Sequence, residues 1–176
     1  SAAIEPLYIL MQFPGETTPE FVNILPFTPS NRNNLIGWMA ARSDGANYGR
    51  TLVYSFPKNI TVNGPAQIRA RINQDSQLSQ LMTLWSQKGS ELLRGNLLVI
   101  PIADTLLYVE PFYLQSADGA SKLPELRQVA VASQDQLKTA KTFDEAFALL
   151  VPGVAPPQPP QAQPGQAEQP ATAKQP

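Results

Sequence analysis

The sequence has 176 residues, a net charge of −1, and neither cysteine nor histidine. These absences exclude disulfides, thiolate chemistry, metal sites built on Cys or His, and triads that need histidine as the base. The balanced charge provides no basic field to hold phosphates, so we expect no nucleic-acid partner. We expect no bound metal and no cofactor.

The composition changes near residue 152. From Pro152 to Pro176 the chain is dominated by Pro, Gln, Ala and Gly and contains no aromatic residue. Such a segment buries too little apolar surface to offset the entropy of ordering it. We therefore expect one domain over residues 1–151 and a disordered tail over residues 152–176. The prolines of Ala155–Gln161 leave open a second reading, in which they dock in an aromatic groove of a partner.

Two extended segments open the chain. Leu7–Phe13 is rich in large apolar and aromatic residues and stops at Pro14-Gly15, which predicts a strand. Glu20–Phe27 is a second, weaker extended segment.

A helix is predicted next, over Thr28–Arg42. Thr28 resembles an N-cap, Pro29 would take the first helical position, and an apolar stripe follows at helical spacing. Ser43–Gly49, with an Asp-Gly pair, then reads as a turn that returns the chain to the sheet. The stripe consists of Leu35, Trp38 and Met39.

The middle of the chain alternates between the two kinds of element. Leu52–Phe56 predicts a short strand, and Pro65–Ile72 a helix that starts with proline. Asp75 or Ser76 caps a clearer helix, and Glu91–Arg94 predicts a last half-turn of helix. The apolar face of the clearer helix comprises Leu78, Leu81, Met82 and Trp85.

A long apolar hairpin is the most strand-like part of the sequence. Its arms are Leu97–Ile102 and Leu106–Leu114, joined by a turn at Ala103-Asp104-Thr105, and we expect at least the first arm to be buried on both faces. Charges and prolines within this run argue against a membrane-spanning helix. These interruptions are Pro101, Asp104, Glu110 and Pro111.

The remaining segments complete the predicted fold. Gln128–Ala132 alternates as a strand does, and Thr142–Glu145 matches a capping box before a short helix, Ala146–Leu150. Strands mixed with helices, without regular β-α-β alternation, indicate an α+β fold. We expect a mixed or mainly antiparallel sheet containing the hairpin, with helices packed on one face of it.

Polar side chains concentrate between Leu25 and Arg50, next to tight turns. Such side chains either fasten an irregular loop or bind a ligand, and both readings stay open. The ligand would be a small polar or anionic molecule; oxygen ligands near the Asp-Gly turn also suggest an ion. The candidate ligand-binding residues are Asn31, Arg32, Asn34, Arg42, Asp44 and Asn47.

No set of residues in the sequence names a reaction, so no catalytic residue is assigned. A carboxylate-based hydrolase is the enzymatic alternative, since pairs of Asp or Glu can act as acid and base. Its candidate carboxylates are Asp44, Asp75, Asp104 and Glu110, of which Asp75 is more simply a helix cap.

Arginines and tryptophans have structural readings that we favour. Arginines beside apolar runs commonly bond carbonyls at the ends of elements or pair with a carboxylate, and anion binding is the alternative. Both tryptophans are expected in the core, with stacking on a ligand as the alternative. The residues concerned are Arg42, Arg69, Arg71, Arg94, Trp38 and Trp85.

Five strings of the sequence, in their order and spacing, closely resemble one family over Pro6–Leu150. It is the family of bacterial and cyanobacterial membrane proteins known as uncharacterised protein family 0182. The proline-rich tail lies outside the common pattern. The strings are PFTPSNRNNLIGWMAARSDGANYGR, GPAQIRARINQD, LMTLWSQKGS, RGNLLVIPIADTLLYVEPFYLQ and LPELRQVAVA.

The resemblance implies a parent protein with several N-terminal transmembrane helices followed by a large extracytoplasmic region, of which this chain is the end. The chain itself would not span the membrane. It would lie on the extracytoplasmic side of the cell membrane, with the rest of the parent and other envelope proteins as partners. We therefore expect a non-catalytic domain that works through protein–protein or intramolecular contacts.

Overall fold

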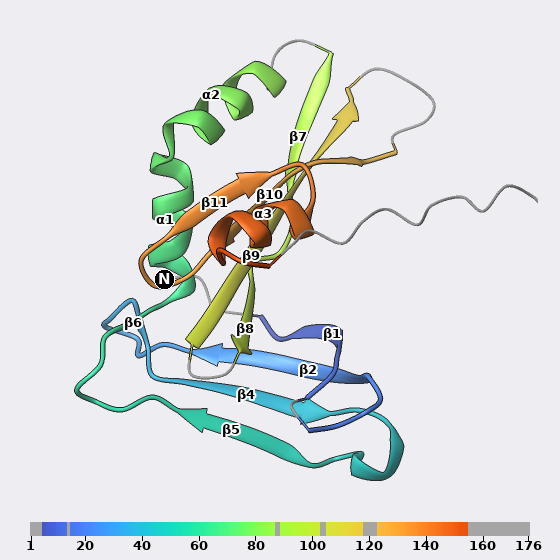
Figure 1. Ribbon diagram of the computed structural model, residues 1–176, viewed down its shortest axis with the longest axis vertical. Helices are drawn as coiled ribbons and strands as arrows, with labels where there is room; N and C mark the ends of the chain where they lie inside the picture. The colour runs from blue at the N-terminus through green and yellow to red at the C-terminus, as the bar shows by residue number, and fades with distance from the viewer. Residues whose placement is uncertain (1–4, 14, 87–88, 103–104, 118–122, 155–176) are drawn as a thin grey trace, which may run out of the picture.

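The computed structural model describes residues 5–13, 15–86, 89–102, 105–117 and 123–154. Within these residues the fold is α+β, as predicted, with two larger antiparallel sheets, a two-stranded ribbon and three α-helices. Figure 1 shows one sheet at the bottom of the view and the second sheet, with its helices, standing above it. The predicted tail from residue 155 onward and the turn residues Ala103 and Asp104 lie outside the described residues.

The lower sheet, here called the N-terminal sheet, is a meander of four strands. They are β1 (Leu7–Met11), β2 (Glu20–Phe27), β4 (Gly37–Arg42) and β5 (Thr51–Ser55), and each pairs with its neighbour in that order. In β2, alternate residues are buried, which places one side of the strand against the core. The strand predictions for the segments of β1, β2 and β5 are confirmed.

The predicted helix over Thr28–Arg42 is wrong. After a turn in which the Arg32 N–H donates to the Pro29 carbonyl (3.2 Å), the chain forms the short strand β3 (Asn34–Leu35) and then β4. β4 pairs with β2 on one side and β5 on the other. As a helix, the segment would leave both neighbouring strand edges unpaired, and its asparagines and Gly37 are poor helix formers. β3 pairs with β6 (Val62–Asn63).

The C-terminal sheet is built around β9 (Thr105–Ser116). On one edge β9 pairs with β10 (Glu125–Ala132), which in turn pairs with β11 (Leu137–Ala140). The other edge is shared by two strands, β7 (Ser90–Arg94) and β8 (Leu98–Ile102). The predicted half-turn of helix over Glu91–Arg94 is therefore wrong, because this segment completes the edge of β9 as β7. The predicted hairpin of β8 and β9 is confirmed.

The three helices cover both faces of the C-terminal sheet, instead of the single face expected. α3 (Phe143–Leu150) packs on β10 and β11 (Figure 1). α1 (Pro65–Gln74) and α2 (Ser76–Trp85) lie on the other side, where their residues join the main core. Asp75 caps α2 as predicted, by accepting a hydrogen bond from the Leu78 N–H at 2.8 Å. α3 begins at Phe143, earlier than predicted, and Thr142 accepts from the Glu145 N–H at 3.3 Å.

This layering explains why β9, the second arm of the hairpin, is buried on both faces. In β9, Leu107 and Val109 contribute to a cluster under α3, whereas Tyr108 and Phe112 contribute to the main core on the opposite face. β8 is only partly buried, so the expectation for the first arm is wrong. The sequence shows both arms as apolar, but of the two arms only β9 has buried residues in both clusters.

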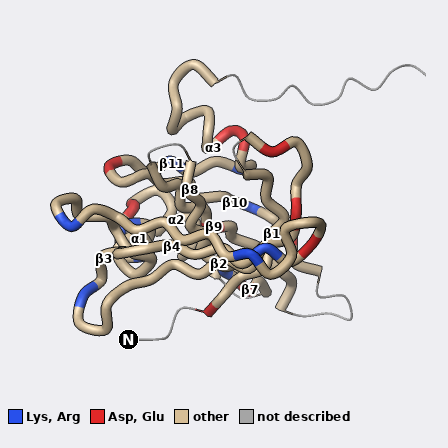
Figure 2. The backbone as a smooth tube through the Cα atoms, turned by 90° about the horizontal axis from the view of Figure 1, so that it is seen from below, with Lys and Arg blue, Asp and Glu red and all other residues tan. Residues whose placement is uncertain are grey.

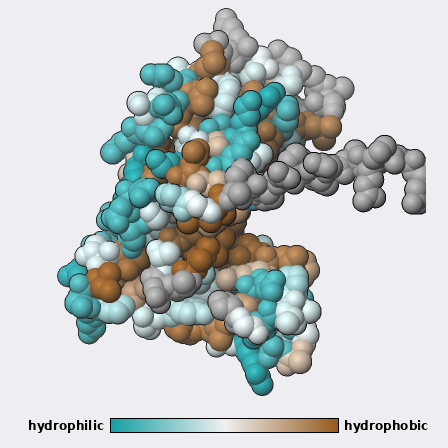
Figure 3. Space-filling model, viewed as in Figure 1, coloured by the Kyte–Doolittle hydropathy of each residue, from teal (hydrophilic) through white to brown (hydrophobic). Residues whose placement is uncertain are grey.

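The main core joins the two sheets, and Trp38 is at the junction. The Trp38 side chain has no exposed surface, and its indole Nε1–H donates to the Val99 carbonyl of β8 at 2.8 Å. Figure 3 shows apolar residues gathered at the waist where the two parts meet. A second link comes from Tyr108, whose hydroxyl donates to the Asn63 carbonyl; burial raises the pKa of this phenol, so it stays a donor at neutral pH.

We predict that Trp38→Phe lowers the free energy of unfolding by about 2–4 kcal/mol. The Val99 carbonyl loses its donor, and a smaller ring leaves a cavity between the sheets. Urea denaturation of Trp85→Phe is the matched control, because Trp85 is only partly buried and its indole donates no hydrogen bond to a described residue. Equal destabilisation by the two substitutions would contradict the assigned role of Trp38.

Candidate functional site

The structure divides the predicted polar cluster into two groups. Asn31 and Arg32 lie in the exposed turn before β3, and Asn34 belongs to β3, opposite Asn63. Arg42 ends β4, and Asp44 and Asn47 follow it in the turn before β5. Arg42, Asp44 and Asn47 share the lining of a depression of about 430 Å3 with Glu16 and Glu20, while Arg32 lines a different pocket.

Arg42 is held by two carboxylates. Its guanidinium donates to Glu16 through Nη1 at 2.8 Å and Nη2 at 2.5 Å, and its Nε forms an ion pair with Glu20. The guanidinium also lies over the Phe13 ring, 5.2 Å from its centroid. The hydrogen bonds with Glu16 are the main cause that raises the pKa of Arg42. These contacts fasten the segment of Glu16 and Glu20 to the end of β4.

The neighbouring polar residues also bond within the protein. Asp44 accepts a hydrogen bond from the Phe21 N–H at 3.1 Å, and Asn47 accepts one from the Arg50 guanidinium at 3.1 Å. These bonds hold the turn against β2 and β5. They are what the fastening role of this cluster requires.

The structural reading is confirmed as well for Arg71 and Arg94. Arg71 donates to the carbonyls of Ser133 and Gln134 at 3.1 and 2.7 Å. Arg94 pairs with Glu110 at 2.8 Å, and Arg69 makes a longer contact of 3.4 Å with the same carboxylate.

The carboxylates of the hydrolase alternative are spread over the fold. Asp44 bonds to the N-terminal sheet, Asp75 caps α2, and Glu110 is ion-paired in β9. Asp104 lies outside the described residues. Among the residues that the structure describes, no three His, Cys, Asp or Glu side chains are grouped closely enough to hold a metal ion.

A feature that the sequence reasoning missed is the outer face of the N-terminal sheet, the side turned away from the core. Phe21 is 54% exposed, and the registers of the four strands place apolar side chains around it. None of the outward positions of these strands carries a charge. The apolar residues of the outer face are Tyr8, Leu10, Phe21, Leu25, Phe27, Met39 and Val53, and the polar, uncharged Asn23, Thr51 and Ser55 lie among them.

The charged residues of the four strands lie at strand ends: Glu20 opens β2 and Arg42 closes β4. In Figure 2, which views the molecule from below, β2 and β4 cross the centre of the picture largely in tan. The sequence held a signal for this face. Glu20–Phe27 has apolar residues in both phases of its alternation, so one set is left outside once the other is buried.

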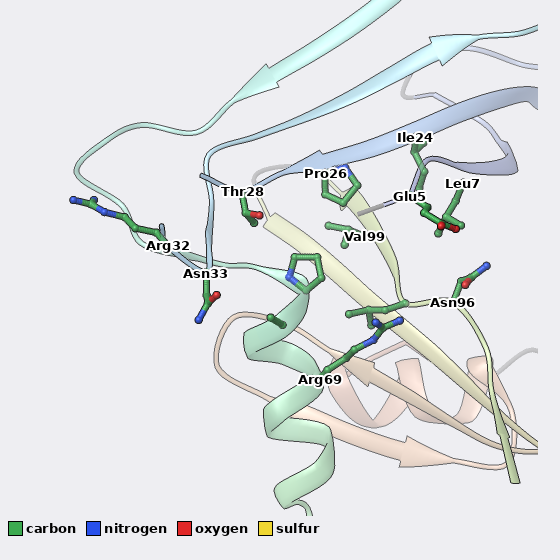
Figure 4. A pocket seen from close by; sticks show the side chains of 13 residues that line it. Glu5, Leu7, Ile24, Pro26, Thr28, Arg32, Asn33, Arg69, Asn96 and Val99 are labelled. Atoms are coloured by element: carbon green, nitrogen blue, oxygen red, sulfur yellow. The ribbon is translucent and has the colours of Figure 1, made fainter. Parts of the chain in front are cut away.

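The second feature is a cavity between the two sheets, here called the inter-sheet pocket, with a volume of about 440 Å3. Figure 4 shows the side chains that line it, which come from β1, β2, the loop that follows β2, α1 and the chain around β8. Its lining is mixed, with apolar residues in the middle and polar residues at the ends. Of the predicted site residues, only Arg32 lies here.

No helix among the described residues is both long enough and apolar enough to cross a membrane. In the comparison with solved structures, no match was found.

Comparison with known proteins identifies relatives of this chain. The model of the uncharacterised protein family UPF0182 matches residues 1–85. The UPF0182 protein of Pelotomaculum thermopropionicum is 54% identical over 144 residues, which are 82% of this chain and 16% of that relative. That of Moorella thermoacetica is 49% identical over 169 residues, 93% of this chain and 18% of the relative. That of the cyanobacterium Trichodesmium erythraeum is 51% identical over 144 residues, 82% of this chain and 16% of the relative.

The chain thus spans only 16–18% of the length of these three relatives. The similarity to them extends well past the residues that the family model matches, into the C-terminal sheet. The chain belongs to the uncharacterised protein family UPF0182.

Proposed function

We propose that this region is a non-catalytic docking domain on the extracytoplasmic side of the cell membrane, within a longer integral membrane protein. Its outer face binds another region of the same polypeptide. The uncharged apolar surface of the N-terminal sheet is the observation that carries this proposal.

The contiguous apolar residues of the outer face favour a state in which another part of a protein covers them. Single exposed apolar side chains are common, but contiguous patches usually mark an interaction site. On the outer face, Tyr8 and Leu10 of β1 lie opposite Asn23 and Phe21 of β2, and Met39 and Val53 continue the surface across β4 and β5. Burial of such a surface contributes roughly 25 cal/mol for each Å2 removed from water.

The rest of the polypeptide is the occupant that we favour. The chain spans 16–18% of the length of its relatives, so most of each relative is available to cover the face. A segment attached to the same chain acts at a high effective concentration, which lets even a modest interface stay closed. Another envelope protein or a second copy of the domain would have to reach the face from solution.

Hydrogen exchange, measured on the full-length protein and on the isolated region, tests this proposal. We expect the amides of β1 and β2 to exchange at least about tenfold more slowly in the full-length protein, because the cover adds protection. Phe21→Lys should abolish this difference, since a charge in an apolar interface is costly. The same substitution should change the stability of the isolated region by about 0.5 kcal/mol or less, because Phe21 is exposed there.

Leu84→Lys is the matched control. Leu84 is 56% exposed, close to the 54% of Phe21, but it lies on α2, away from the outer face. It should leave the protection of β1 and β2 unchanged. Identical exchange in the full-length protein and the isolated region would overturn the proposal, and a concentration-dependent protection of the isolated region would assign the face to a second copy.

A further inference from the structure

The inter-sheet pocket is separate from the outer face, on the opposite side of the N-terminal sheet. Ile24 and Pro26 are inward-facing residues of β2, and Val99 faces them from β8. Leu7 of β1 and Leu97, just before β8, extend this apolar middle (Figure 4). A volume of about 440 Å3 falls in the range of pockets that bind small molecules.

One end of the pocket offers hydrogen-bond donors that the protein leaves unused. Arg69 reaches from α1 toward Asn96 in Figure 4, and its side chain is 50% exposed. Among the described residues, its only polar contact is the 3.4 Å ion pair with Glu110, whose other oxygen is already bonded to Arg94 at 2.8 Å. Among the described residues, neither Arg69 nor the Asn96 side chain donates a hydrogen bond.

Arg42 and Arg69 differ in how many of their hydrogen-bond donors are already engaged. Arg42 is saturated by Glu16 and Glu20, so it has little capacity left for a ligand. The Arg69 guanidinium lies at the cavity wall, ion-paired through Nε with the buried Glu110 carboxylate at 3.4 Å, and its remaining donors are available. A guanidinium fork suits an incoming carboxylate or phosphate.

The charge around the pocket also favours an anion. Two arginines, Arg32 and Arg69, are among its lining residues, against one carboxylate, Glu5. Arg32 extends away from the others at the far end in Figure 4, so it contributes to the local potential and does not line the same end as Arg69. Glu5 lies across the pocket from Arg69 and opposes anion binding there.

We propose that the inter-sheet pocket binds a small amphipathic anion. Its carboxylate or phosphate group bonds to Arg69 and Asn96, and its apolar body lies on Ile24, Pro26 and Val99. This binding site is independent of the docking proposed for the outer face, so either can fail alone.

Titration calorimetry and thermal-shift measurements on the 176-residue chain test this site, with octanoate and octyl phosphate as probes. Acetate and inorganic phosphate supply the head groups alone, and octanol supplies the apolar body alone. We expect the two amphipathic anions to bind and to raise Tm, each at least about tenfold more tightly than its head group or octanol. Stronger binding of octanoate or of octyl phosphate then identifies the preferred head group.

Two kinds of variant locate the site. Arg69→Ala should weaken octanoate binding at least about tenfold, whereas Arg127→Ala, which removes a surface arginine paired with Glu125, should have no effect. Because Arg69 also contacts Glu110, Ala66→Leu provides a test that does not touch that pair. It should narrow the pocket and weaken binding, while Ala70→Leu, on the same helix but not in the lining, should not.

Glu5→Gln should tighten octanoate binding about two- to threefold, since it removes the opposing charge. Three results would overturn the proposal. The first is no binding of either amphipathic anion at about 10 mM ligand, a concentration that detects even weak complexes. The others are octanol binding as tightly as octanoate, and unchanged octanoate binding in both Arg69→Ala and Ala66→Leu.

Discussion

Gly64→Ala is expected to destabilise the domain by at least about 3 kcal/mol. A Cβ at residue 64 would lie 1.9 Å from the Asn33 carbonyl oxygen and 3.0 Å from the Thr28 Cγ2. The contact is with backbone, so a rotamer change cannot relieve it. Either the loop after β2 or the start of α1 has to move.

The site of this clash explains why such a movement is costly. Gly64 is the N-cap residue of α1, and its N–H donates to the Gln67 side chain at 2.9 Å. The preceding Asn63 is bonded through its N–H and side-chain amide to Gln134, both at 3.0 Å, and accepts the Tyr108 hydroxyl. A shift at Gly64 therefore disturbs contacts to the C-terminal sheet.

Urea denaturation of Gly64→Ala, beside Gly37→Ala, measures this effect. A Cβ at Gly37 would lie 3.2 Å from the Tyr54 carbonyl oxygen, so a movement of a few tenths of an ångström accommodates it. We expect a clearly smaller loss for Gly37→Ala. If both variants lose the same free energy of unfolding, the close approach of α1 to the Asn33 carbonyl does not constrain the fold.

Arg94→Met is expected to lower the free energy of unfolding by about 3–5 kcal/mol. The Glu110 side chain is only 1% exposed, and Arg94 gives it a hydrogen bond of 2.8 Å while bonding Asn73 of α1 at 2.8 Å. Without Arg94, the one ion pair left to Glu110 among the described residues is the 3.4 Å contact with Arg69. A buried carboxylate that lacks a hydrogen-bonded cation destabilises the folded state. The intact Arg94–Glu110 pair, in contrast, contributes little net stability, because its attraction is offset by the cost of removing both charges from water.

A double-mutant cycle separates these two statements. Arg94→Met/Glu110→Leu should be more stable than Arg94→Met alone, because the unpaired carboxylate is gone. Arg127→Met is the control for loss of an exposed pair: its partner Glu125 is 66% exposed, so we expect a loss of about 1 kcal/mol or less. Additive losses from Arg94→Met and Glu110→Leu would refute the coupling.

Much of the fold could be predicted from local patterns. The segments of β1, β2, β5, α1, α2 and the β8–β9 hairpin all have a clear period, a capping residue or a proline stop. The two wrong assignments, Thr28–Arg42 and Glu91–Arg94, share a cause. Their apolar spacing also fits a strand, and neighbouring strands of the sheets supply the pairing that decides between the two.

The candidate sites were harder to predict. The concentration of Asn and Arg before Arg50 drew attention to Arg42, Asp44 and Asn47, whose bonds are made within the protein. Arg69 was assigned a structural role from its place beside an apolar run, because its free donors depend on which carboxylate faces it in the fold. The outer face was visible only as an excess of apolar residues in β2, which does not say which side is covered.

The α+β class, the family and most element positions can be assigned from the amino-acid sequence alone, because periodicity, caps and long motifs are local properties of the chain. Three further features are visible only in the folded chain: the division into two larger sheets, the helices on both faces of one of them, and the link that Trp38 makes between them through the Val99 carbonyl. Those outcomes depend on contacts between residues distant in sequence. A strand with two apolar faces can be buried on both, like β9, or left open on one, like β2.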